Sequence, residues 1–325
     1  MEYGLQLANM EFPKLRDVAQ AAEGLGYHTL LVPDHIVAEG PERQHDPRFL
    51  SWDSMVEVAV LAEATRRVRV GQLVACNLFR HPVMTAQSFN TLDHLSAGRL
   101  IAGLGTGWTE REFRMTGIPF PEIGPRLRML DEALDCIRSL WANEETTFAG
   151  EFYQLKDAIL WPKPVSKPHP PILLGGGGKG LLRIAAKHAD VVNIISDAGK
   201  PGYIKLANVA KLTNDSFRAK VQFLRDEAKR HGRDPRTIQI SNVIFSTVLT
   251  GSPDETRSVA EGMAPMFQTT PEGILQSPMA LIGTAEECLK ELRRRQQDWE
   301  LSQVIFAFPG DGAMRRLAED VLPHV

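Results

Sequence analysis

The chain has 325 residues, of which 43% are hydrophobic and 24% charged, and its formal net charge is −3 at pH 7. These values are typical of a globular protein with a large core, and they mark the chain neither as a nucleic-acid binder nor as a binder of anionic membranes. No apolar run approaches the roughly 20 residues that span a bilayer, and residues 1–13 lack the basic start and apolar stretch of a signal peptide.

Short apolar segments that alternate with helical segments run through the whole chain. The expected strands are residues 3–9, 28–33, 68–75, 100–104, 172–174, 190–195, 238–249 and 304–308. The expected helices are residues 13–26, 53–66, 82–96, 126–141, 179–188, 204–231, 252–267, 285–297 and 312–321. Residues 146–155 are predicted as a hairpin, and residues 161–171, which contain five prolines, as an extended connector.

This alternation predicts the fold class. Short, continuously apolar strands separated by helices indicate a parallel sheet that is covered on both sides. Eight such units favour a closed α/β barrel, the (β/α)8 TIM barrel, over an open sheet. Because no linker or break in composition divides the chain, we predict a single domain over residues 1–325. In such a barrel the carboxyl ends of the strands carry the active site.

Four consecutive glycines, residues 175–178, follow a predicted strand and open the next helix. Their backbone can approach a ligand closely and turn its N–H groups toward an anion, which the helix N-terminus also favours. Gly176, Gly177 and Gly178, with the charge of Lys179, therefore predict a phosphate site. A mobile turn is the alternative.

The same run allows a second interpretation. Gly175, Gly177 and Gly180 satisfy the pattern G-x-G-x-x-G, and Asp197 follows about 20 residues on, as in a fold that binds NAD(P)H. The motif begins only after four strand-helix units, however, whereas such a fingerprint normally opens its domain. A barrel contains the same strand-loop-helix geometry, so the match carries limited weight.

Two more segments place chemical groups at strand ends. Gly107 and Trp108 end a glycine-rich run, where a flat ring could lie against the backbone with the indole as a wall. The alternative is a tight connection with Trp108 in the core. Asp34 and His35 follow the second strand, where a carboxylate and an imidazole can orient a heterocycle and move protons near neutral pH. A local cap or turn is the alternative for this pair.

The cysteines argue for a reducing compartment. Cys76, Cys136 and Cys288 are odd in number and far apart, so they predict neither a disulfide framework nor a zinc site, and we expect a cytoplasmic protein without a bound metal. Cys76 itself is expected to be buried and inert. Its neighbour Asn77 offers an amide for the polar atoms of a ring.

Together these segments resemble the luciferase-like monooxygenase superfamily over nearly the whole chain. The most specific stretch is residues 91–121, TLDHLSAGRLIAGLGTGWTEREFRMTGIPFP, which is similar to the signature of the family's fourth strand. Further similar segments are residues 32–35, 80–82, 150–153, 162–164, 171–178 and 281–284.

The resemblance implies a (β/α)8 barrel with an insertion near strand seven, often dimeric. It also implies that reduced FMN or the deazaflavin coenzyme F-420 binds at the C-terminal face. On this basis the residues from Gly176 to Gly178 hold the cofactor phosphate and Asp34 touches the polar edge of the ring. The segment around Val74 and Ala75 supplies a bulge, often a non-prolyl cis peptide, that supports the back of the ring.

The choice of cofactor rests on finer similarities. Asp34 and His35, Asn77 before residues 80–82, and the glycine run leading into residues 189–193 resemble the group that depends on coenzyme F-420, with FMN as the alternative. Deazaflavin sugar-phosphate dehydrogenases carry a glutamate where this chain has Trp108. This departure argues against sugar-phosphate dehydrogenation and leaves His35 as the candidate general acid or base, with Glu110 second.

We therefore expect a cytoplasmic, homodimeric oxidoreductase that transfers a hydride between deazaflavin and a small organic substrate, with no nucleic-acid or membrane partner. The loop of residues 34–51 is expected to close the substrate pocket. Three alternatives stay open: an FMN-dependent monooxygenase, a non-catalytic flavin-binding relative, and a dinucleotide-fold dehydrogenase that binds NAD(P)H.

Overall fold

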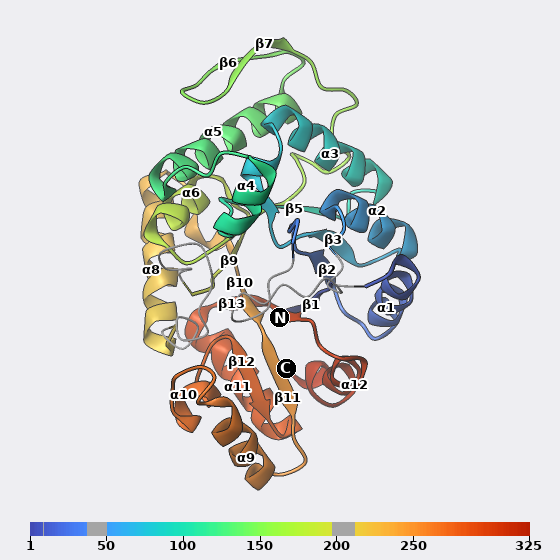
Figure 1. Ribbon diagram of the computed structural model, residues 1–325, viewed down its shortest axis with the longest axis vertical. Coiled ribbons are helices and arrows are strands. Elements are labelled where there is room, and N and C mark those ends of the chain that lie inside the picture. Colours follow the sequence, from blue (N-terminus) through green and yellow to red (C-terminus); the bar gives the residue numbers. More distant parts are fainter. Residues whose placement is uncertain (9, 38–50, 197–211) are drawn as a thin grey trace.

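Parallel strands close into a barrel at the centre of the molecule (Figure 1). The computed structural model describes residues 1–8, 10–37, 51–196 and 212–325. Around the barrel the strands are β3 (Arg69–Gln72), β2 (Thr29–Val32), β1 (Glu2–Gln6), β13 (Leu301–Ala307), β10 (Gln239–Ile244), β9 (Val191–Asn193), β8 (Ile172–Gly175) and β5 (Leu100–Gly105). Pairing of β3 with β5 completes the circle, so the predicted (β/α)8 barrel is confirmed.

Helices surround the strands, and most of them lie where the 3.6-residue period predicts them (Figure 1). In chain order the described helices are α1 (Phe12–Gly24), α2 (Ser54–Ala64), α3 (Pro82–Leu95), α4 (Glu110–Thr116), α5 (Ile123–Ala142), α6 (Lys179–His188), α8 (Asn214–Arg230), α9 (Pro253–Met263), α10 (Pro271–Leu275), α11 (Ala285–Trp299) and α12 (Asp311–Arg316). Shorter helical turns are Asn77–Phe79, Pro235–Thr237, Leu317–Val321 and Leu322–His324. None of the described helices is both long and apolar enough to cross a membrane.

Local sequence explains where these helices begin and what they bury. In α1 the buried side chains recur at three- and four-residue spacing, so one face packs on the sheet: Leu15, Val18, Ala19 and Ala22. Thr284 caps α11 and its partner Glu287 completes a capping box. The helix predicted over residues 204–231 is described from Asn214, where Thr213 forms the cap; residues 204–211 lie outside the described residues.

The barrel interior is closely packed because several strands carry glycine where their backbones approach. A Cβ on Gly103 would lie 1.8 Å from the carbonyl oxygen of Gln72, and a Cβ on Gly71 would lie 2.1 Å from that of Ile101. Both distances are far below van der Waals contact. The interior apolar cluster that fills the remaining space consists of Leu31, Ile101, Leu173, Val191, Val243, Ile305 and Ala307.

The predicted strand over residues 238–249 is wrong in its second half. The chain leaves the barrel after β10, and β11 (Ser246–Leu249) pairs with β12 (Ala280–Gly283) in a separate two-stranded sheet. With α9 and α10 this sheet forms an insertion after the seventh barrel strand, at the lower end of Figure 1. An insertion near strand seven was expected, and it is confirmed.

The insertion is fastened to the barrel by a buried arginine. Arg295 of α11 is fully buried and donates hydrogen bonds to the carbonyl oxygens of Ser277, Pro278 and Ala280 at 3.1, 3.1 and 2.6 Å. Its Nε lies 2.7 Å from the carboxylate of Glu291. A buried guanidinium is tolerated only with such partners, so this contact ties β12 to α11.

A hairpin projects from the opposite end of the molecule, at the top of Figure 1. Its antiparallel strands are β6 (Thr146–Ala149) and β7 (Gln154–Ala158), which confirms the predicted hairpin. The proline-rich connector follows and contains cis bonds before Pro162 and Pro168.

The three cysteines are free and buried. Burial raises the pKa of Cys76, Cys136 and Cys288 each to about 12. Thiolate is the reactive form, so these thiols are unreactive at neutral pH, as expected for Cys76.

Candidate active site

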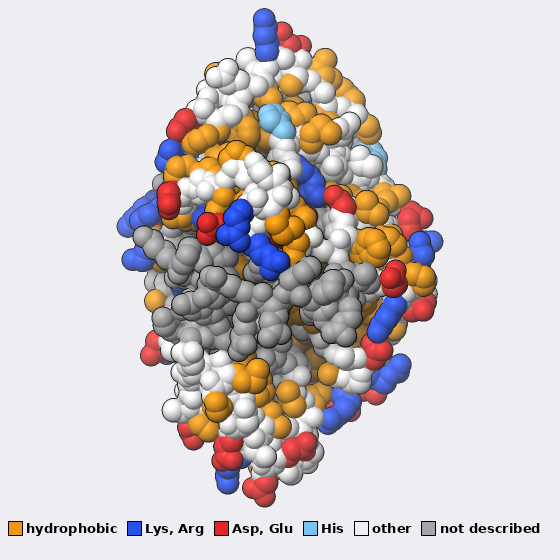
Figure 2. Space-filling view, in the orientation of Figure 1, with side chains coloured by type: hydrophobic (Ala, Val, Ile, Leu, Met, Phe, Trp, Pro, Cys, Tyr) orange, Lys and Arg blue, Asp and Glu red, His pale blue; other side chains and the backbone are white. Residues whose placement is uncertain are grey.

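The predicted site residues follow strands whose carboxyl ends form one rim of the barrel. Asp34 and His35 follow β2, Trp108 follows β5, and the glycine loop follows β8. Since the strands are parallel, these ends meet at the same mouth. Figure 2 shows acidic, basic and apolar side chains interspersed over the described part of the face drawn there.

His35 lies in a network with a residue that sequence reasoning missed. Its Nδ1 is 3.1 and 3.2 Å from the two carboxylate oxygens of Glu112, whose side chain is 2% exposed. The His35 and Trp108 rings are close to perpendicular, with 5.4 Å between their centroids. The imidazole is 27% exposed, so it can reach a ligand. Trp108 is half-buried beside it and does not lie in the core.

Glu110, the second candidate for proton transfer, is the exposed first residue of α4. Side chains two residues apart on a helix point in directions that differ by about 200°, so Glu110 and Glu112 cannot face the same neighbour. Within α4 it is Glu112 that faces His35.

Asp34 is buried and both of its carboxylate oxygens have protein partners. Arg80 lies 2.8 Å from Oδ2, Ser54 donates to Oδ1 at 2.8 Å, and the backbone N–H of Cys76 donates to Oδ2 at 2.9 Å. Arg80 also pairs with Asp53, the N-cap of α2, at 2.8 Å. Asp34 therefore ties the ends of β2 and the third strand to α2, while its predicted contact with a ring stays a prediction.

Glu57 is a further buried carboxyl near this cluster. Burial raises its pKa to about 7, and the carboxylates of Asp34 and Asp53 add to the rise. As the pH rises, the unfolded chain, in which Glu57 has a pKa of 4.5, therefore releases this proton at a lower pH than the folded protein does.

Replacing Glu57 with glutamine should stabilise the protein above neutral pH. The stability from the raised pKa is fully present below pH 4.5 and is lost as pH rises through about 7. A neutral amide avoids this loss. The free energy of unfolding should therefore rise by on the order of 2 kcal/mol at about pH 8 and change little at about pH 5. Urea unfolding of both proteins at the two pH values measures the difference. A stabilisation of the same size at both would show that Glu57 does not titrate in this range.

The third strand is interrupted where a ring-supporting bulge was predicted. β3 ends at Gln72, a non-prolyl cis peptide bond joins Leu73 to Val74, and the chain continues as β4 (Ala75–Cys76). The predicted cis bulge is thus confirmed, and its support of a cofactor ring stays a prediction. Gln6 of β1 donates to the carbonyl of Leu73 at 2.7 Å and so holds the bulge from inside the barrel.

Two glycines on neighbouring strands make room for Val74. A Cβ on Gly105 would lie 2.6 Å from one Val74 methyl group, and a Cβ on Gly175 would lie 3.1 Å from the other. Gly107 has φ of +75°, and a Cβ there would lie 2.8 Å from the sulfur of Cys76. Packing against Val74 and Cys76 therefore explains why glycine stands at positions 105, 107 and 175.

Asn77 follows the interrupted third strand and contacts the hairpin. Its side chain is buried, and its amide donates to the hydroxyl of Tyr153 at 3.3 Å. Tyr153 belongs to the turn between β6 and β7, so the contact fastens the hairpin. The predicted role of Asn77 in ring binding stays a prediction.

The glycine loop has the geometry of an anion site. Gly176 has φ of +151°, and its N–H donates to the carbonyl of Asn193 at 3.0 Å. Gly178 is the N-cap of α6 and provides no side-chain cap, so no capping side chain of its own competes with a ligand for the first N–H groups of the helix. A phosphate fits such donors, which supports a nucleotide-like cofactor at this position.

Two lysines flank the loop. Lys220 of α8, which sequence reasoning missed, places its ammonium 2.6 Å from the carbonyl oxygen of Gly177. Lys179 is exposed, and its ammonium lies 5.5 Å from the ring centre of Phe223, also on α8. Of these two lysines, Lys220 of α8 therefore places its charge against the loop backbone. The expected contribution of Lys179 to phosphate binding stays a prediction.

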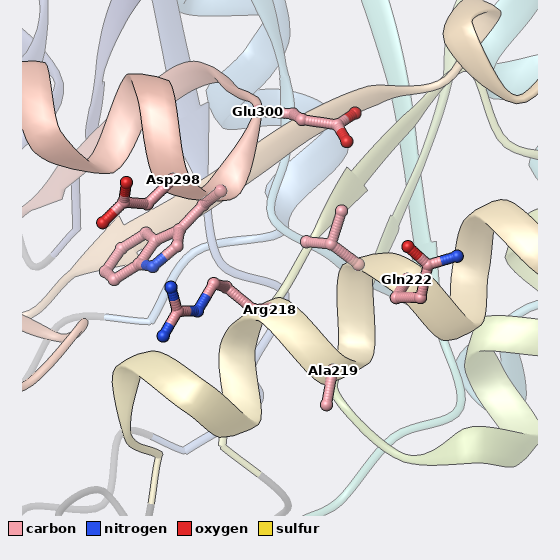
Figure 3. Close-up of a pocket in the computed structure, with 7 residues that line it drawn as sticks. Arg218, Ala219, Gln222, Asp298 and Glu300 are labelled. Atoms are coloured by element: carbon pink, nitrogen blue, oxygen red, sulfur yellow. The ribbon is translucent and has the colours of Figure 1, made fainter.

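A cavity of about 340 Å³ lies apart from this rim, between α8 and the end of α11 (Figure 3). Its charged lining residues Arg218, Asp298 and Glu300 are paired with Asp215, Arg294 and Arg225 at 2.5, 3.0 and 2.8 Å. Because the charged groups of this cavity are engaged in ion pairs with the protein, we retain the rim as the candidate active site.

The dinucleotide-fold alternative is excluded by the architecture. The glycine run connects β8 to α6 in a closed barrel, whereas the alternative requires an open sheet with a reversal of strand order. Asp197 and most of the expected pocket loop, residues 38–50, lie outside the described residues.

Known proteins resemble the chain in sequence and in shape. An F-420-dependent glucose-6-phosphate dehydrogenase from Amycolatopsis mediterranei is 28% identical over 96% of this chain and 94% of its own. The structure of an F-420-dependent secondary alcohol dehydrogenase with an F-420–acetone adduct superposes with a TM-score of 0.78 at 20% identity, covering 100% and 98% of the two chains. That of long-chain alkane monooxygenase gives 0.78 at 16% identity, covering 99% and 90%.

The two structural likenesses show the fold, and the match to a family model identifies the family. The family described as luciferase-like monooxygenase matches residues 4–299. The match includes the rim residues of the second, third, fourth and fifth barrel strands. The protein therefore belongs to the luciferase-like monooxygenase family.

Proposed function

We propose that the protein is a coenzyme F-420-dependent oxidoreductase that transfers a hydride between the deazaflavin and a small organic substrate. The observation that carries the proposal is His35, a partly exposed imidazole held by a buried carboxylate at the barrel mouth. The relative from Amycolatopsis mediterranei, which bears an F-420-dependent name and matches 96% of the chain, supports the choice of cofactor.

The residues at the mouth suit the parts of such a cofactor. The bound deazaflavin would supply hydride chemistry, while the protein positions it and handles protons. The N-terminus of α6, with Gly176 to Gly178 and Lys179, would bind the phosphate. Val74 and Ala75 would lie behind the ring, Gly107 and Trp108 would bound it, and Asp34 and Asn77 are proposed for its polar edge. His35 would exchange a proton with the substrate, with Glu110 as the second candidate.

Apolar side chains at the strand ends support an organic substrate other than a sugar phosphate. Phe245 follows β10 directly and Phe308 follows β13 directly, and they are 39% and 49% exposed. Ile36 lies beside His35 and is 41% exposed. Exposed aromatic and aliphatic side chains at a barrel mouth favour a substrate with an apolar body. Trp108, at the position of the glutamate of sugar-phosphate dehydrogenases, agrees with this.

The proposal includes a cytoplasmic homodimer in which residues 1–325 act as one domain. The outer face of α2 carries an apolar stretch that ends at the exposed Glu63: Val56 is 51% exposed, and Ala59 and Val60 are half-buried on the same side. Met84 of the neighbouring α3 is also exposed. Exposed apolar side chains on two adjacent helices form a surface that a second copy of the chain would cover.

Cofactor choice is tested by titration of the purified protein with F-420 and with FMN. F-420 should bind at micromolar protein, seen as a quench or shift of its fluorescence, and more tightly than FMN in the same buffer. Equal or tighter binding of FMN would favour the FMN-dependent monooxygenase. Tight binding of F-420 without turnover on a panel of alcohols and ketones would favour a non-catalytic relative.

A further inference from the structure

We propose that Glu112 is a positioning residue that keeps the hydrogen of His35 on Nδ1 and so leaves Nε2 as the atom that exchanges a proton with the substrate. The inference rests on the proposed function in one respect, the proton role of His35. It adds which ring nitrogen reacts and what determines that choice.

Three N–H groups converge on the Glu112 carboxylate. His35 Nδ1 lies 3.1 and 3.2 Å from its two oxygens, and the backbone N–H groups of Ile36 and Val37 donate to Oε1 at 2.6 and 3.2 Å. The side chain is 2% exposed, so solvent does not replace these donors. A buried carboxylate needs such donors, and here three consecutive residues, 35–37, supply them.

The chemistry of the two groups determines the tautomer. An ionised carboxylate only accepts hydrogen bonds, so the nitrogen that faces it must carry the hydrogen. A neutral imidazole has one N–H, and Nε2 is then left with a lone pair. A proton that moves from a substrate hydroxyl to Nε2 breaks one O–H bond and forms one N–H bond. The resulting imidazolium has its positive charge beside Glu112, which stabilises it.

The surrounding contacts keep the ring in this orientation. The Trp108 ring packs nearly perpendicular to the imidazole, with 5.4 Å between the ring centroids. The bonds to Ile36 and Val37 also fix the backbone directly after His35, so Glu112 positions both the ring and the chain that carries it. Glu112 need not touch the substrate to act in this way.

The substitution Glu112→Gln tests the inference without removing the backbone contacts. The amide oxygen takes the place of Oε1, which accepts from Ile36 and Val37. The amide nitrogen then takes the place of Oε2, the oxygen nearer to His35 Nδ1 at 3.1 Å, where it can only donate. The hydrogen should therefore move to Nε2. Nitrogen-15 NMR of the imidazoles, with His35 assigned by comparison with His35→Ala, should show the Nδ1–H tautomer in the parent and the Nε2–H tautomer in the variant. Turnover should fall roughly thirtyfold and cofactor affinity less than about threefold.

Glu132→Gln is the matched control. Glu132 also accepts three hydrogen bonds, from the backbone N–H groups of Glu151, Phe152 and Tyr153 at 2.8, 2.9 and 3.3 Å, but no histidine is among these donors. It should change neither the His35 signals nor turnover.

Two results would overturn the inference. One is an Nε2–H tautomer of His35 in the parent protein, which can be observed even if the glutamine variant does not fold. The other is a tautomer that inverts in Glu112→Gln while turnover stays at the parent value. Failure of the proposed function has a different signature, because it would appear as unchanged turnover in His35→Ala whatever the tautomer.

Discussion

Replacing His35 with alanine should lower turnover by about a hundredfold or more, the usual effect of removing a general acid or base. Cofactor affinity should change far less, because the glycine loop and Asp34 remain. The fold should survive, since Glu112 keeps its bonds to the N–H groups of Ile36 and Val37. Steady-state kinetics and a cofactor titration of the same preparation measure both quantities.

His231→Ala provides the control, because it removes an exposed imidazole at the end of α8. It should leave turnover and affinity unchanged. If His35→Ala loses affinity and turnover in proportion, His35 is a ring-binding or structural residue. If turnover does not change, the proton role passes to another group, and Glu110 is the next to replace.

Replacing Gly177 with valine should weaken cofactor binding about a hundredfold. A β-branched side chain would stand where backbone and phosphate are expected to meet, and losing two N–H contacts to an anion costs on the order of 3 kcal/mol. Gly177 is buried and lies between the end of β8 and the start of α6. Fluorescence titration gives the affinity, and a thermal melt reports whether the fold is retained.

Gly262→Val is the matched substitution. Gly262 lies in α9, and a Cβ added there meets no atom within 4 Å. This variant should bind cofactor like the parent. Normal binding by Gly177→Val would mean that the loop does not hold the phosphate, whereas a loss seen equally in both variants would point to general destabilisation.

The barrel could be predicted from sequence because each of its strands is short, apolar and followed by a helical period. The helix over residues 179–188, for example, has the predicted bounds. The insertion could not be separated from the barrel in this way. Residues 238–249 form one apolar run, and the pattern does not show that β11 leaves β10 to pair with β12. α4 was missed because only Glu112 and Phe113 are buried in a short, highly charged helix.

The candidate site was predicted in outline for a similar reason. Glycine runs and the pair of Asp34 and His35 stand directly after strands, where a barrel places its chemistry. Glu112 and Lys220 reach the site from distant helices, 77 and 43 residues from His35 and Gly177 respectively. From sequence alone, a charged helix residue that faces a site cannot be distinguished from one that is exposed to solvent. The available signal was helical spacing, which separates Glu112 from Glu110.

The burial of all three thiols makes this chain a convenient background for site-directed labelling. With Cys76, Cys136 and Cys288 buried and protonated, a cysteine introduced at an exposed position such as Gln296 on α11 would be the thiol that a maleimide dye reaches. No cysteine-free parent has to be made first. In the proposed homodimer, dyes on the two copies would then report the distance between subunits, and a dye near the rim would follow the arrival of a ligand.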